Sequence, residues 1–186
     1  MPAHVYVDQT TCKSSVDSSD DIYLLVFRGS TTSPFNNSMS VIHPSAFADF
    51  DDGESRGNDI QVARYFADRV YVVALMERDA DNDFLDNNAG PLELIRAQAN
   101  LAWVTRMASL SLAHHGTIDD DDRKTAADLV ITAMQGTIDI STRWPIGDDD
   151  EIGRAKYLKI APGEEPVLTY SGGGGNYRIR FKVKPN

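Results

Sequence analysis

Short apolar runs of the kind that form β-strands dominate the first eighty residues of the chain. Residues 4–13 (HVYVDQTTCK) and 21–29 (DIYLLVFRG) are rich in β-branched and aromatic side chains, and a Ser/Asp cluster separates them. A shorter run at 39–44 ends in a proline, whereas residues 45–59 are acidic and predict a loop. Residues 69–79 (RVYVVALMERD) give the strongest strand signal, and their continuous apolar run predicts a central, well-buried strand.

From Pro91 the spacing of the apolar residues changes to that of a helix. The first apolar face consists of Leu92, Ile95, Ala99, Trp103, Met107 and Leu110, at intervals of three and four. The second consists of Ala127, Val130, Ile131, Met134 and Ile138. Pro91 suits a first helical turn and Gly116 suits a stop, so the pattern predicts an antiparallel helical hairpin over about residues 91–140.

The pattern returns to strands after residue 150. Residues 151–160, 166–170 and 176–184 each favour a strand, and the last alternates apolar with basic side chains. The glycines at 172–175 form a turn, since no Gly-Lys-Ser/Thr motif or helix follows them. These elements predict a mainly β chain: an antiparallel β-sandwich of about seven to eight strands, with the helical hairpin inserted in it, as a single domain over residues 1–186.

Composition narrows the classes of partner. The formal charge of −10 and the pI near 4.7 argue against nucleic acid as a partner, because nucleic-acid binding needs a basic face. Cys12 is the only cysteine, which excludes an intramolecular disulfide and a zinc site built from thiolates. The first residues show no basic start followed by an apolar core, so we expect no Sec signal peptide, and no run approaches the roughly 20 apolar residues of a membrane span. We therefore expect a cytoplasmic protein, or one exported by a route that needs no N-terminal signal.

Acidic residues fall into four clusters, each where a predicted strand begins or ends. The clusters are Asp17/Asp20/Asp21, Asp49/Asp51/Asp52, Glu77/Asp79/Asp81/Asp83 and Asp148/Asp149/Asp150/Glu151. Carboxylates from several loops suit a hard cation such as Ca²⁺, which takes six to eight oxygen ligands. Solvated turns rich in Asp are the simpler alternative for any one cluster. An EF-hand starting at Asp79 fails, because Phe84 stands where glycine is required and Gly90 where glutamate is required.

Two stretches resemble the calcium loops of the synaptotagmin-like C-two domain, a calcium-binding β-sandwich. The stretch "DSSDDIYLLVF" resembles the first calcium loop, with Ile22 in place of the family's proline before a tyrosine. The stretch "VVALMERDADND" resembles a later strand and loop of that family. The expected continuation, an acidic pair followed by a hydrophobic residue and a glycine, appears only at "DDDEIG", residues 148–153.

This split predicts where the helices enter the fold. With residues 84–147 left out, Asp83 is followed directly by "DDDEIG", which gives one uninterrupted loop of the family pattern. We infer that the helical hairpin is inserted inside a calcium-binding loop. The resemblance implies that Ca²⁺ is bound by Asp20, Asp21, Glu77, Asp79, Asp83, Asp149 and Asp150.

The resemblance implies a non-enzymatic module that binds calcium ions and associates with an anionic membrane surface or a protein partner. A second hypothesis is a membrane-active toxin or effector that uses the helical hairpin, and a third is a purely structural subunit. A glycoside-directed enzyme is a lesser alternative, because the many carboxylates make any acid–base pair unspecific. No Gly-x-Ser-x-Gly motif supports a hydrolase, and no histidine partner for Cys12 is identifiable.

Overall fold

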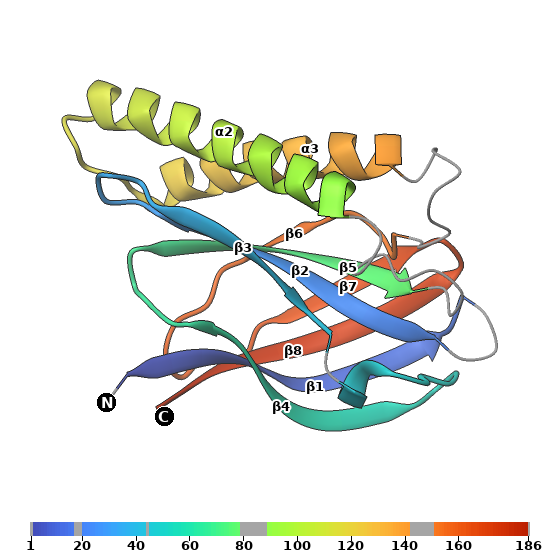
Figure 1. Ribbon diagram of the computed structural model, residues 1–186. Coiled ribbons are helices and arrows are strands. Elements are labelled where there is room, and N and C mark those ends of the chain that lie inside the picture. Colours follow the sequence, from blue (N-terminus) through green and yellow to red (C-terminus); the bar gives the residue numbers. More distant parts are fainter. Residues whose placement is uncertain (1, 17–19, 44, 79–88, 142–150, 186) are drawn as a thin grey trace.

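The computed structural model describes residues 2–16, 20–43, 45–78, 89–141 and 151–185. The predicted mainly β class is confirmed, because this part of the chain forms two antiparallel four-stranded sheets and two long helices (Figure 1). The first sheet has the strand order β4 (Ser55–Arg64), β1 (Ala3–Ser14), β8 (Gly175–Pro185), β7 (Val167–Gly172). The second has the order β3 (Asn37–Ile42), β2 (Asp21–Ser30), β5 (Arg69–Arg78), β6 (Lys156–Leu158).

The two sheets share an apolar core. Val7 of β1 and Phe181 of β8 belong to the same buried cluster as Leu24 of β2 and Leu75 of β5. Side chains on a strand alternate between its two faces, so these residues mark the surfaces by which the sheets face each other. Burial of this apolar surface holds the two sheets together.

The central strands of the second sheet are buried on both faces. Tyr23, Leu25 and Phe27 of β2 belong to a second core that includes the helices, whereas Leu24 and Val26 face the first sheet. A strand covered on both sides has no solvent-exposed face to carry polar residues. This explains the continuous apolar runs of β2 and β5 and confirms the predicted central position of the strand over residues 69–78, while Asp79 lies outside the described residues.

Helices α2 (Ala89–Ala113) and α3 (Asp120–Ser141) lie side by side over the outer face of the second sheet (Figure 1). The predicted apolar face of α2 is turned towards the sheet, and Trp103 and Met107 are completely buried. The Trp103 ring lies on Gly29 of β2, where an added Cβ would stand only 2.2 Å from Cε2 of the ring. In the described part of the chain, neither helix is long and apolar enough to cross a membrane.

Two expectations about the strands need correction. Residues 55–59, expected in a loop, open strand β4, and a short 3-10 helix η1 (Ser45–Phe47) precedes it. β4 lies at the edge of its sheet and buries only Val62 and Ala63, so its sequence carries almost no apolar pattern. The strand expected over residues 151–160 is reduced to Lys156–Leu158, with one isolated bridge at Glu151.

Candidate functional site

Acidic residues from separate segments gather at one end of the two sheets. This acidic end lies where β2 begins and β5 ends, beside the segment that links η1 to β4 (Figure 1). An isolated β-bridge between Asp20 and Phe50 connects the residue before β2 to the segment between η1 and β4. The acidic end comprises Asp20, Asp21, Asp49, Asp51, Asp52, Glu54, Glu77 and Glu151.

Asp20 is the innermost carboxylate of the acidic end and is completely buried. Its two oxygens accept hydrogen bonds from the backbone N–H of Val16, at 3.0 and 2.9 Å, and Oδ2 also accepts one from the Tyr177 hydroxyl, at 2.6 Å. Burial raises the pKa of Tyr177 well above its ordinary value, and the bond to Asp20 raises it further. Tyr177 is therefore a proton donor here, and Asp20 joins the β1–β2 link to the core.

The neighbouring carboxylates also hold backbone segments in place. Asp21 Oδ1 accepts a hydrogen bond from the N–H of Asp49, at 2.8 Å. Asp52 Oδ1 accepts bonds from both the N–H and the hydroxyl of Ser15, at 2.6 and 2.8 Å, and these bonds lower the pKa of Asp52. Arg56 pairs with Glu54 and donates to the carbonyl oxygens of residues 48 and 49. The acidic residues thus link β1, β2 and the segment before β4.

The residues that precede the first half of the predicted broken loop lie beside the residues that follow its second half. Met76, near the end of β5, forms an isolated antiparallel bridge with Glu151, and the N–H of Ile152 donates to the carbonyl of Leu75 at 3.1 Å. Glu77, one residue before the end of β5, is buried and pairs in register with Ile22 of β2. The chain therefore leaves β5 and returns at Glu151 on the neighbouring position, with both helices between these two points.

Glu151 connects the acidic end to helix α3. Gln135 donates hydrogen bonds from Nε2 to the carboxylate of Glu151 and to Oδ1 of Asp139. Burial raises the pKa of Glu151 to about 7, and the negative charge of Asp139 adds to the rise. Oε1 of Glu151 is buried and has no hydrogen-bond partner in the described part of the chain. A positive charge near this carboxylate would restore its ordinary acidity.

The structure places three of the seven predicted calcium ligands at the acidic end: Asp20, Asp21 and Glu77. The other four, Asp79, Asp83, Asp149 and Asp150, lie outside the described residues. Among the described residues, no group of three or more His, Cys, Asp or Glu side chains is arranged to hold a metal ion. Asp20, Asp21 and Glu77 provide carboxylate oxygens, the donor type that Ca²⁺ takes.

Sequence patterns missed the residues that hold these carboxylates in place. Tyr177 is 157 positions from Asp20 and read as one more apolar residue of an alternating strand. Gln135 and Asp139 lie on the polar side of a predicted helix, where such residues need no special explanation. The one sequence feature that pointed to Tyr177 is the alternation of apolar and basic side chains over residues 176–184, which places Tyr177 on the apolar, buried face of the strand.

The basic face of β8 is neutralised by acidic residues of the same sheet. Arg180 and Lys182 form ion pairs with Asp8 of β1. Lys182 and Lys184 also pair with Asp59 of β4. These three cations therefore face carboxylates on β1 and β4 of the same sheet.

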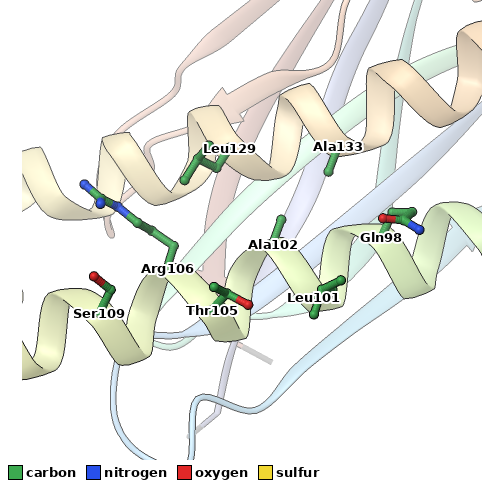
Figure 2. Close-up of a pocket in the computed structure, with 8 residues that line it drawn as sticks. All are labelled: Gln98, Leu101, Ala102, Thr105, Arg106, Ser109, Leu129 and Ala133. Carbon is green, nitrogen blue, oxygen red and sulfur yellow. The ribbon is translucent and has the colours of Figure 1, made fainter.

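A groove of about 520 Å³ lies on the helical layer between α2 and α3 (Figure 2). Leu101 and Leu129 line it, and Arg106 extends along it from α2. Leu101 is 63% exposed, and Leu112 at the end of α2 is 82% exposed. The helices therefore bury one apolar face on the sheet and keep several leucines on the opposite face.

Comparison with known proteins finds no family model that matches the chain and no curated protein significantly similar to it.

Proposed function

We propose that this chain is a Ca²⁺-stabilised binding module, a β-sandwich similar to the C-two domain with its two helices inserted in a calcium loop. The observation that carries the proposal is that the chain, after forming the two helices, rejoins the second sheet next to the end of β5, where it left the sheet. Residue 151 pairs with residue 76, so the acidic stretches that flank the helices start from adjacent positions. Asp21 begins the neighbouring strand β2 at the same end of the sheets, and Asp20 directly precedes it.

The proposed ligands divide into two roles. Asp20 fixes the first loop through Val16 and Tyr177, and it contributes to the cation from the inner side. Asp21 and Glu77 supply oxygens from β2 and β5, and Asp79, Asp83, Asp149 and Asp150 complete the set. Carboxylates that converge without a cation repel one another. Burial and the charge of Asp139 raise the pKa of Glu151, which stands beside the point where the second acidic stretch rejoins the sheet.

Thermal unfolding tests the proposal. A ligand that binds only the folded state adds about 2.7 kcal/mol at a hundred times its Kd, which is a rise in Tm of about 5–10 °C for a chain of this size. We expect this rise with CaCl₂ after removal of metals with EDTA, and a much smaller rise in Asp21→Asn. Asp128→Asn is the matched control, because Asp128 is exposed on α3 and its carboxylate pairs with the exposed Lys124. No shift in the wild-type protein at millimolar CaCl₂ would refute the proposal.

The exposed leucines of the helices favour a second candidate, in which the helical layer acts on membranes. Leu94, Leu101 and Leu112 lie on the outer side of α2, away from the sheet. Liposomes separate the two candidates. Ca²⁺-dependent binding without leakage supports the module, whereas leakage that disappears when α2 is cross-linked to the sheet supports membrane activity.

A further inference from the structure

Three arginines converge on a small pocket at the end of the sheets opposite the acidic end. The pocket has a volume of about 130 Å³ and is lined by Arg28, Ser38, Arg64, Phe66 and Arg69. Arg28 lies near the end of β2 and Arg69 begins β5, whereas the acidic end lies where β2 begins and β5 ends. Arg64 ends β4, so both sheets contribute to the pocket.

These arginines have no carboxylate in direct contact among the described residues. In the described part of the chain, none of the three forms an ion pair, although Arg56, Arg180 and Lys182 do. Arg28 donates from Nη2 to the Ser40 hydroxyl at 3.3 Å, but its Nε is buried and has no hydrogen-bond partner. Such a cluster is unexpected in a chain with 28 acidic and 18 basic residues.

The carboxylate of Asp68, which directly precedes Arg69 of the pocket, forms its hydrogen bonds with hydroxyl groups. It accepts hydrogen bonds from the hydroxyls of Ser30 and Thr32, at 2.9 and 3.0 Å. These bonds and the charge of Arg69 outweigh burial and lower the pKa of Asp68. Asp68 therefore stays charged and partly offsets the charge of Arg69 through space, but in the described part of the chain it forms no ion pair with the arginines of the pocket.

The pocket is held in shape before any ligand arrives. The guanidinium groups of Arg64 and Arg69 lie over the Phe66 ring, 4.9 and 5.4 Å from its centroid. Arg69 also donates to the carbonyl of Asn36 at 2.9 Å. The Tyr71 hydroxyl donates to the carbonyl of Arg64 and accepts from the N–H of Phe66, both at 3.1 Å. Side chains fixed in this way lose little freedom when they bind a ligand.

We propose that this pocket binds phosphate, either as inorganic phosphate or as the terminal group of a small phosphate monoester. A guanidinium presents parallel N–H donors that match the oxygens of phosphate, and Arg28, Arg64 and Arg69 bring three guanidinium groups to the lining of the pocket. The volume equals that of about four water molecules in the liquid, which is enough for one tetrahedral oxyanion. An anion also offsets the mutual repulsion of the three cations.

Calorimetric titration of the whole chain in EDTA tests this site independently of any calcium site. The probes are inorganic phosphate, glycerol phosphate and acetate at matched ionic strength, because exposed charges are screened by salt. We expect both phosphates to bind at least about tenfold more tightly than acetate, since acetate lacks the third oxygen. Arg64→Gln should weaken phosphate binding about tenfold or more, corresponding to the loss of one charge-assisted contact. Arg106→Gln, on helix α2, is the matched control and should bind as the wild type does.

The two phosphate probes distinguish the source of the ligand. Tighter binding of glycerol phosphate assigns the pocket to a monoester, and tighter binding of inorganic phosphate assigns it to the free ion. Arg64 is exposed, so its substitution should leave the fold intact, which far-UV circular dichroism verifies. Absence of heat with either phosphate up to about 10 mM, a concentration that detects even weak binding, overturns the proposal. Equal binding of phosphate and acetate, or no effect of Arg64→Gln, also overturns it.

Discussion

The contact between Trp103 and Gly29 should decide whether the helices can dock on the second sheet. An alanine Cβ at position 29 would stand 2.2 Å from Cε2 of Trp103. Carbon atoms in contact lie about 3.5–4.0 Å apart, so the ring would have to move by about 1.3–1.8 Å. β2 is paired on both sides and Trp103 is completely buried against Phe27, so neither can move without disturbing its neighbours. Overpacking of this kind typically costs about 1–3 kcal/mol.

Urea unfolding followed by far-UV circular dichroism measures this cost. We expect Gly29→Ala to lower the free energy of unfolding by at least about 2 kcal/mol. In a Trp103→Leu background, which itself costs about 3 kcal/mol, the same change should cost less than about 0.5 kcal/mol because the ring is gone. Gly136→Ala in α3 is the control: nothing lies within 4 Å of its added Cβ, and it should stabilise the chain by about 0.5–1 kcal/mol. An equal cost of Gly29→Ala in both backgrounds would refute the docking geometry.

Three further predictions concern the acidic end and the outer surface. Tyr177→Phe should destabilise the chain by about 1–3 kcal/mol in urea unfolding, because it removes a buried hydrogen bond to the Asp20 carboxylate; a cost below about 0.5 kcal/mol would contradict this. In EDTA, Glu151→Gln should raise the Tm at pH 8 and leave it unchanged near pH 4.5. The folded-state pKa of Glu151, about 7, exceeds its ordinary value of 4.5, so the wild-type protein loses part of its free energy of unfolding as the pH rises from 4.5 to 7. A gain in Tm of Glu151→Gln that is the same at both pH values would argue against this cause. Leu112→Gln should change the free energy of unfolding by less than about 0.5 kcal/mol, since this side chain is 82% exposed, and a larger loss would place it in a contact that the structure does not contain.

The strands that could be predicted from the sequence are those whose side chains are buried on both faces of the sheet. β2 and β5 are covered by the helices on one side and by the first sheet on the other, so their apolar runs are continuous and easy to identify. The apolar stripe of α2 follows from one-sided burial in the same way. β4 escaped prediction because an edge strand with two buried residues leaves almost no pattern, and its pairing with β1 joins segments about fifty residues apart.

The candidate site could be predicted only through its charges. Clustered acids mark the strand ends, and the structure brings Asp20, Asp21 and Glu77 to one end of the sheets. The partners that set their environment come from distant segments, and polar residues such as Gln135 carry no pattern of their own. The pocket of three arginines escaped prediction for the same reason, since β2, β4 and β5 contribute one arginine each.

Calorimetric titration with Ca²⁺ tests the central claim most directly. The wild-type protein, freed of metals, is compared with Asp79→Ala and with the control Asp128→Ala, in which an exposed acid of α3 is removed. We predict a clear binding heat for the wild type and the control, and its loss in Asp79→Ala. Equal traces for wild type and Asp79→Ala would contradict the account and leave the carboxylates of the acidic end with a purely structural role, as acceptors that hold backbone segments in place.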